Sequence, residues 1–171
     1  MKKFLIVGAL AIAGVMSAQT QKGNVVISGK SGLGYENVSI KDVDGSTNKF
    51  DFAVGAGYFV ADNLSIGAEA EVSSIKASGS DAVNLYSFLP SVSYYFGQTN
   101  ARPYLKGQVG LAGASASGTT KTGLALGAEA GVAYFFTNNF AANINLGYKN
   151  LKIDQVKTNT FNTGVGLAVF F

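Results

Sequence analysis

Glu69 and Glu71 are two residues apart, and paired carboxylates of this kind can do general acid–base work. The sequence contains no His and no Cys. Hydrolysis by a Ser-His-acid triad and most zinc sites need an imidazole, so neither is available to this chain. Alternation along the segment puts both glutamates on one face beside cations, which favours a structural role. We predict no enzymatic activity, and no catalytic, cofactor-binding or metal-ligating residue.

Gly29-Lys30-Ser31 resembles the end of a phosphate-binding loop. Asn24 stands where that motif needs its leading glycine, and the segment has strand periodicity instead of a strand-loop-helix pattern. Nucleic acid is also excluded as a partner, because Lys2 and Lys3 account for much of the positive charge. Without them, 11 basic residues face 10 acidic ones, and no basic face remains.

The elements that must position these residues are long strands. Apolar residues recur at every second position over segments longer than the usual strand of about 5–6 residues. Eight strands are predicted, at Asn24–Tyr35, Lys49–Val60, Leu64–Ile75, Val83–Phe96, Arg102–Gly113, Gly123–Phe136, Phe140–Leu151 and Thr160–Phe171. Pro90 cannot donate a ladder hydrogen bond, so it predicts a bulge or a local break in its strand.

The connections between these strands alternate in length. Three are tight, at Ala61–Asn63, Gly97–Ala101 and Thr137–Asn139, and four are longer and polar, at Glu36–Asn48, Lys76–Ala82, Ala114–Thr122 and Lys152–Asn159. Short turns at one end and longer loops at the other are typical of outer-membrane barrels, in which both termini would be periplasmic. The Glu36–Asn48 loop contains Asp44-Gly45, a hairpin signal. It could recruit an extracellular partner by strand addition, or be a solvated hairpin.

Charge separates the two faces of the predicted strands. One phase is apolar and carries no charged residue in any predicted strand; it includes Phe52, Ile66, Leu126 and Leu167. The opposite phase carries Lys30, Lys49, Asp51, Glu69, Glu71, Arg102, Lys106, Glu129 and Lys149. A charge facing lipid would cost about 2–4 kcal/mol at the bilayer midplane for Lys or Arg. We therefore predict an all-β fold, an eight-stranded antiparallel up-and-down transmembrane barrel with its charges inside.

Charges inside so narrow a barrel must be paired. Five of them lie at comparable depth when counted from the turns: Lys30, Glu69, Glu71, Lys106 and Glu129. We predict that they form one network of ion pairs and hydrogen bonds; separate local pairs bridged by water are the alternative. Inward glycines are predicted to make room for the long charged side chains: Gly55, Gly57, Gly127, Gly131, Gly164 and Gly166.

Aromatic residues recur at the strand ends before the tight turns and at the end of the sequence. The repeats are Tyr58-Phe59-Val60, Tyr94-Tyr95-Phe96, Tyr134-Phe135-Phe136 and Val169-Phe170-Phe171. They predict an interfacial girdle that contains Tyr58, Tyr94, Phe96, Tyr134 and Phe136. The alternatives are the core of a soluble barrel or sandwich, whose apolar phase would point inward.

The first residues read as a secretory signal peptide, 1–18. Lys2 and Lys3 precede an apolar run, Phe4–Val15, and Met16-Ser17-Ala18 forms a small-residue cleavage site. The apolar run is short for a membrane-spanning helix, which needs about 20 residues, so cleavage is favoured over an uncleaved anchor. The barrel domain would then be Gln19–Phe171, located in the cell outer membrane.

The signal peptide, the alternating strands, the Tyr/Phe-rich turns and the ending Val169-Phe170-Phe171 resemble the small OmpA/OmpX-type outer-membrane barrels. In that group the barrel-assembly machinery reads a C-terminal aromatic, which implies such a role for Phe171. Unlike OmpA-like proteins, the sequence continues into no peptidoglycan-binding domain. Unlike the lipid A acyltransferases and deacylases of similar fold, it has no His.

The leading functional hypothesis is a non-enzymatic outer-membrane barrel with a structural, adhesive or surface-interaction role. Its expected partners are outer-membrane lipid and the barrel-assembly machinery, with no cofactor. A narrow conduit for ions or small solutes is the alternative. A lipid-acting enzyme and a soluble periplasmic protein are less favoured.

Overall fold

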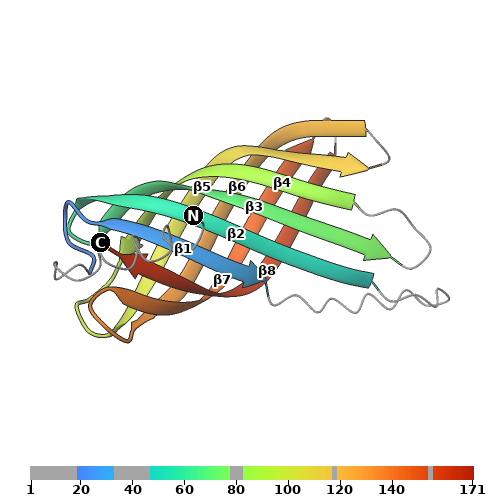
Figure 1. The fold of residues 1–171 in the computed structure, drawn as a ribbon. Helices are drawn as coiled ribbons and strands as arrows, with labels where there is room; N and C mark the ends of the chain where they lie inside the picture. The colour runs from blue at the N-terminus through green and yellow to red at the C-terminus, as the bar shows by residue number, and fades with distance from the viewer. Residues whose placement is uncertain (1–18, 33–46, 78–82, 117–118, 154–155) are drawn as a thin grey trace, which may run out of the picture.

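The chain forms one closed barrel of eight antiparallel strands, each paired with its neighbours in sequence (Figure 1). The computed structural model describes residues 19–32, 47–77, 83–116, 119–153 and 156–171. The strands are β1 (Val25–Gly32), β2 (Thr47–Ala61), β3 (Leu64–Ala77), β4 (Val83–Tyr95), β5 (Ala101–Ala116), β6 (Thr119–Phe135), β7 (Phe140–Ile153) and β8 (Val156–Phe170). All eight predicted strands are confirmed, with ends that differ by a few residues. The predicted signal peptide, residues 1–18, and most of the predicted Glu36–Asn48 loop lie outside the described residues.

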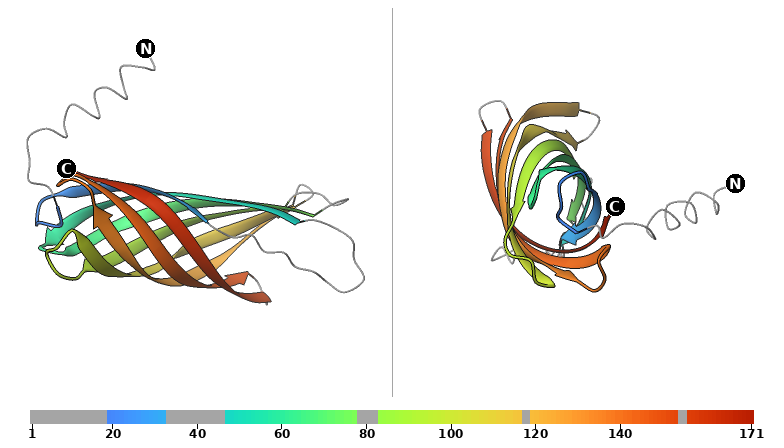
Figure 2. Two further views of the ribbon diagram at one scale, coloured as in Figure 1. Left: turned by 90° about the horizontal axis from the view of Figure 1, so that it is seen from below. Right: turned by 90° about the vertical axis from the view of Figure 1, so that its left-hand side faces the viewer.

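The first and last strands close the barrel. Val26 pairs with Phe170 and Gly32 with Gly164 in an antiparallel ladder between β1 and β8. The ladder is extended by Val25 and Phe171, whose backbone amides each donate to the other's carbonyl at 2.9 and 2.8 Å. Figure 2 shows the cylinder from the side and from one end. Closure leaves no sheet edge exposed along this seam.

Three short turns lie at the same end of the barrel as Phe171 (Figure 1). Asp62 and Asn63 join β2 to β3, and Asn63 has a φ of 65°, a left-handed conformation that Asn tolerates better than most residues. Gly97, with a φ of 77°, follows β4. The predicted tight connections are therefore confirmed. Within the described residues, no helix is long and apolar enough to cross a membrane.

Two of the four predicted long loops are wrong. Ala114 pairs with Lys121 and Ala116 with Thr119, so β5 and β6 continue to a two-residue connection. β7 and β8 likewise continue until Ile153 pairs with Val156. These hairpins extend past the apolar wall, where the outward face of a strand is no longer held apolar. Alternation disappears there although the backbone ladder continues, which is why the residues resemble loops in the sequence.

Pro90 interrupts one of its two ladders, as predicted. Towards β3 the pairing is continuous, with Ala68 opposite Pro90. Towards β5, pairing stops after Phe88 and Leu111 and resumes at Ser91 and Gln108 in the same register. The result is a local break without a bulge, because the register is the same on both sides of the gap. Pro90 lacks an amide hydrogen, and its neighbour Leu89 is also unpaired on that side.

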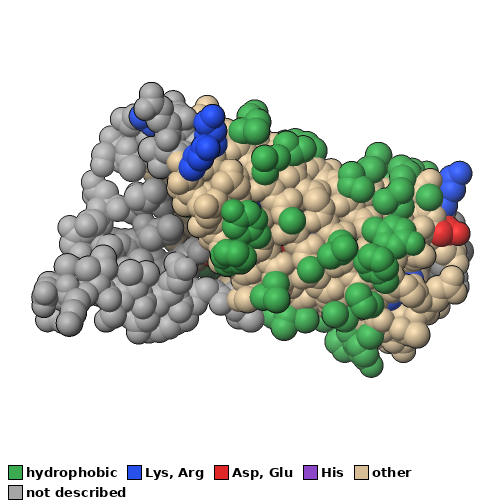
Figure 3. All heavy atoms as spheres, turned by 180° about the vertical axis from the view of Figure 1, so that it is seen from behind, with side chains coloured by type: hydrophobic (Ala, Val, Ile, Leu, Met, Phe, Trp, Pro, Cys, Tyr) green, Lys and Arg blue, Asp and Glu red, His purple; other side chains and the backbone are tan. Residues whose placement is uncertain are grey.

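The apolar phase covers the outside of the barrel. Phe52, Ile66, Leu126 and Leu167 are 47, 48, 50 and 53% exposed. In the face shown in Figure 3, hydrophobic side chains spread over the wall between the two ends. The opposite phase is inside: Glu69, Arg102 and Glu129 are buried. The polarity is thus the reverse of a soluble barrel.

Candidate functional site: the barrel lumen

Four charged side chains from four strands form a closed ring of ion pairs in the lumen. Lys30 on β1 lies 2.8 Å from Glu69 on β3 and 2.5 Å from Glu129 on β6. Lys106 on β5 lies 3.1 Å from Glu69 and 3.4 Å from Glu129. Each lysine thus contacts both glutamates. We call Lys30, Glu69, Lys106 and Glu129 the charge quartet; its two positive and two negative charges balance.

Neutral donors complete the coordination of both quartet carboxylates. The Tyr104 hydroxyl donates to Glu129 at 2.8 Å, and the Gln108 amide donates to Glu69 at 3.2 Å. The side chains of Glu69 and Glu129 are only 3 and 4% exposed. Burial of a carboxylate is tolerated when it is paired and hydrogen-bonded in this way. Saturated carboxylates are poor candidates for acid–base catalysis, since their oxygens already bind donors.

Glu71 lies outside the quartet. It accepts hydrogen bonds from Lys149 on β7 and from Ser87 on β4, the latter at 2.6 Å. Glu71 is two positions beyond Glu69 on β3, so it belongs to the next inward layer towards the long hairpins. The structure therefore brings four of the five predicted lumen residues into one ring. The fifth, Glu71, pairs with Lys149 instead. The sequence predicted that Lys149 faces inward but did not predict this pair. Lys49, another predicted inward cation, lies in β2, but its side chain is not among those described.

The inward glycines make room mainly for uncharged side chains. A Cβ atom at Gly131 would lie 2.7 Å from the ring of Tyr104, and one at Gly164 would lie 2.8 Å from the Asn145 amide. Gly166 also faces a charged side chain closely, because a Cβ atom there would lie 2.9 Å from Lys30 Cβ as well as 2.6 Å from the Asn143 amide oxygen. The prediction that these glycines accommodate charged side chains is thus too narrow, because large neutral groups fill the same layers.

An aromatic cluster, missed by the sequence analysis, fills the lumen at the short-turn end. Phe59, Tyr95, Phe135 and Phe170 point inward, and three of the rings surround Phe170 at centroid distances of 4.8 to 6.3 Å. Each is the middle member of an aromatic or apolar triplet that was assigned to the girdle. Alternation alone requires the middle residue to face the opposite side from its neighbours, so the signal was present in the sequence.

Arg102 closes the same end against the segment Gln19–Asn24. Its guanidinium donates to the side chains of Thr20 and Gln19 and to the backbone oxygen of Thr99, and lies 4.9 Å from the centroid of the Phe135 ring. Backbone bonds from Gly23 to Phe59 and from Asn63 to Thr20 fasten the segment. The right-hand view of Figure 2 shows it lying across the end of the barrel.

A cavity of about 50 Å³ remains between the charge quartet and the aromatic cluster. Lys30, Glu69, Lys106 and Glu129 line it together with Tyr95 and Tyr104. No group of three or more potential metal ligands occurs among the residues that the structure describes. In these layers the lumen is packed, and the charges of the quartet balance.

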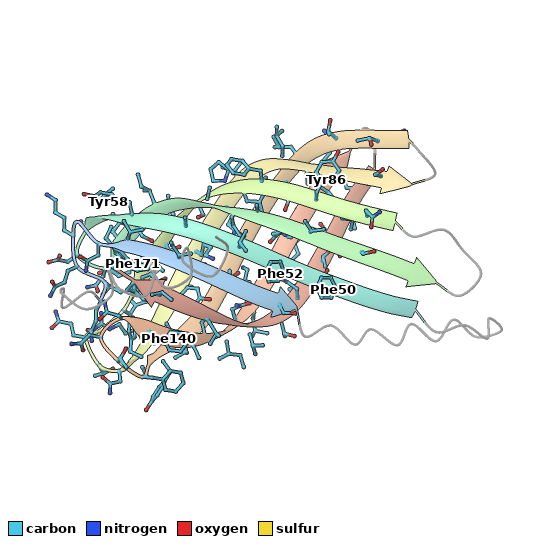
Figure 4. All side chains as sticks on the ribbon, in the orientation of Figure 1. Phe50, Phe52, Tyr58, Tyr86, Phe140 and Phe171 are labelled. Atoms are coloured by element: carbon cyan, nitrogen blue, oxygen red, sulfur yellow. The ribbon has the colours of Figure 1, made fainter. Side chains whose placement is uncertain are left out.

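The remaining predicted site residues lie on the outside of the short-turn end. Tyr58, Tyr94, Phe96, Tyr134 and Phe136 are all exposed. Two pairs of these rings pack edge to face, Tyr94 on Phe96 at 4.9 Å and Tyr134 on Phe136 at 5.3 Å. Phe171 is partly buried beside them, and Figure 4 shows Tyr58, Phe140 and Phe171 at this end, with Phe50, Phe52 and Tyr86 closer to the other.

A comparison with family models identifies the class of protein to which this inside-out barrel belongs. The model described as outer membrane protein beta-barrel domain matches residues 6–168. The chain belongs to this family. It is therefore an outer-membrane β-barrel, and its apolar wall faces lipid. No curated protein matches the chain.

Solved structures of outer-membrane barrels have the same fold. Neisserial surface protein A has a TM-score of 0.67 and 22% identity, over 88% of this chain and 98% of that one. The N-terminal β-barrel domain of Pseudomonas aeruginosa OprF has a TM-score of 0.58 and 20% identity, over 88% and 98%. Pseudomonas aeruginosa OprG has a TM-score of 0.55 and 16% identity, over 92% and 99%.

Proposed function

We propose that this outer-membrane barrel is a closed, non-enzymatic anchor with a structural, adhesive or surface-interaction role. The observation that carries the proposal is the filling of the lumen. The aromatic cluster, the charge quartet and the Arg102 contacts occupy successive layers, and the cavity between them measures about 50 Å³. A barrel with this interior holds its hairpins at a membrane surface without offering a continuous path for solutes.

We place the termini on the periplasmic side and the long hairpins outside. This orientation is supported by the strands that extend past the apolar wall at the end opposite Phe171, since outer-membrane barrels have short periplasmic turns and longer extracellular segments. We also assign Phe171 as the residue that the barrel-assembly machinery reads. Its backbone pairs with Val25, which leaves recognition to its side chain. An extracellular partner at Glu36–Asn48 stays a prediction, because most of that loop lies outside the described residues.

A conduit for ions or small solutes is the second candidate. The polar lining of the cavity favours it, because Ser28, Ser65, Ser91 and Ser93 line it together with the quartet lysines. Opening would require the aromatic cluster or the Arg102 contacts to separate.

Conductance in planar bilayers tests the proposal. Wild-type protein is expected to show no steady openings, whereas F59A/F170A, which removes two rings of the aromatic cluster, is expected to conduct. F50A/F52A is the matched control, since it removes two rings from the outer wall and leaves the lumen filled. Steady openings of the wild type would replace the closed anchor by the conduit. If F59A/F170A does not conduct, the charge quartet and not the aromatic cluster closes the lumen.

A further inference from the structure

Two lysines face outward from the barrel directly opposite one another. Lys152 on β7 pairs in register with Lys157 on β8, and both share the outward phase of Tyr148 and Phe161. The prediction of an uncharged outward phase covered shorter strands and holds over them; the two lysines lie in the strand extensions. They are the outward-facing charges among the strand side chains that the structure describes. Like charges directly opposite in a ladder destabilise it, so this pair needs a counter-charge.

The described part of the chain supplies no such counter-charge. Its ion pairs join the lumen residues and include neither Lys152 nor Lys157. Both side chains are exposed, as is Leu124, which is opposite Lys152 on β6. The two ammonium groups thus stand on the outer wall beside an apolar neighbour.

The outward column below the lysines changes from polar to apolar in steps. Asn150 donates to Asn159 at 2.5 Å in the next outward pair, and the rings of Tyr148 and Phe161 pack at 4.9 Å in the one after. Leu146, Ile144 and Val165 follow, all exposed. This sequence of charge, amide, aromatic ring and aliphatic group follows the polarity profile of one membrane leaflet.

Strand geometry places the lysines at headgroup depth. Phe140 and Tyr148 are about 27 Å apart along β7 at about 3.4 Å per residue, and a tilt of about 40° makes this about 21 Å along the barrel axis. That height is close to the apolar band of about 25 Å in outer-membrane barrels. Lys152 lies about 10 Å further along the axis, and a lysine stem can bend back towards the interface.

We propose that Lys152 and Lys157 bind the phosphate of an anionic membrane lipid whose acyl chains lie over Tyr148, Phe161 and Leu146. A phosphate held between the two ammonium groups relieves their repulsion, and the apolar column below continues the contact along the tail. The site extends the lipid interface that the family establishes. It does not depend on which leaflet the hairpins reach, so failure of the closed-anchor proposal would leave it intact.

Native mass spectrometry of the folded full-length protein, titrated with phosphatidic acid and with phosphatidylcholine, tests the site. K152Q/K157Q is expected to bind the first phosphatidic acid about thirtyfold more weakly than wild type, since each lysine near an anionic surface contributes about a fivefold gain. Phosphatidylcholine binding is expected to be equal in the two proteins. Heat-modifiable migration in gels establishes that the variant is folded, and without anionic lipid it should be at least as stable as wild type.

The matched control is K22Q/K121Q, which removes the same charge from two exposed lysines that lie outside the outward column. It should retain wild-type affinity for phosphatidic acid. So should D154N, which tests the acidic residue two positions after Lys152 in the sequence, outside the described residues. Equal weakening in K22Q/K121Q, clearly tighter binding by D154N, unchanged binding by K152Q/K157Q, or displacement of the lipid by excess inorganic phosphate alone would overturn the proposal.

Discussion

The Glu129 carboxylate binds three donor side chains. Lys30, Lys106 and Tyr104 all bond to it, while Glu69 shares both lysines. Because four strands contribute to the quartet, loss of one carboxylate leaves two lysines from different strands with a single counter-charge. The quartet therefore ties together parts of the barrel wall that are not neighbours.

Replacing Glu129 with Ala is expected to lower the free energy of unfolding by about 3 kcal/mol, as for other buried ion pairs that lose one partner. E71A is the matched control. Glu71 and Lys149 are more exposed, at 19 and 23%, so its loss should be closer to about 1 kcal/mol. Urea unfolding in lipid vesicles, followed by the gel mobility of the folded fraction, measures both. Equal losses of unfolding free energy would show that the quartet stabilises the barrel no more than the Glu71–Lys149 pair does.

Which residues meet inside the barrel was only partly predictable. Counting from the turns correctly put the quartet residues at one depth, because alternation fixes the face and turn position fixes the layer. The partner of Glu71 depends on the stagger between strands, which closure of the barrel sets and no single strand records. Alternation correctly placed Lys149 inside the barrel, but the sequence did not indicate which acidic residue it would pair with. The inward rings Phe59 and Phe170 were missed although alternation determines their side.

At the scale of the strand, the break at Pro90 is accompanied by a close approach of β4 and β5. A Cβ atom at Gly110 would overlap the carbonyl oxygen of Phe88 and lie 3.0 Å from Leu89 Cα. Gly110 is the register partner of Leu89 where ladder pairing is lost. Glycine at this position therefore permits backbone contact beside the proline.

G110A is expected to destabilise the barrel by about 1–3 kcal/mol, the usual cost of forcing extra volume into a packed site. The control is G107A on the same strand, where a Cβ atom would meet nothing within 4 Å. That variant should be neutral or slightly stabilising, since alanine restricts the unfolded chain. The same unfolding assay compares them. A neutral G110A would mean that β4 and β5 lie further apart at Pro90 than described.

Strand ends were less predictable than strands. Within the apolar wall, the period of two is enforced by different surroundings on the two faces, and all eight strands could be found from it. Beyond the wall, the outward positions of β5 to β8 are polar as well, so Ala114, Lys121, Lys152 and Lys157 resemble loop residues in the sequence. The outward lysine pair was hidden for this reason, because it depends on register in a region without hydrophobic alternation.

For the whole molecule, one inversion of polarity connects the observations. The wall is apolar, the interior holds the charges, and the family match makes the surrounding medium an outer membrane. The closed lumen, the lipid site at Lys152 and Lys157 and the role of Phe171 all assume this arrangement. A soluble protein of the same topology would require the opposite faces.

Fluorescence quenching of single-cysteine variants in bilayers tests the inversion most directly, since the chain has no native Cys to interfere. Labels at Phe52, Ile66, Leu126 and Leu167 should be quenched by lipids that carry a quencher in their tails and be protected from aqueous iodide. A label at Thr99, in a short turn, should behave in the opposite way. Quenching of the four wall positions by iodide, with no effect of the lipid quencher, would contradict the account.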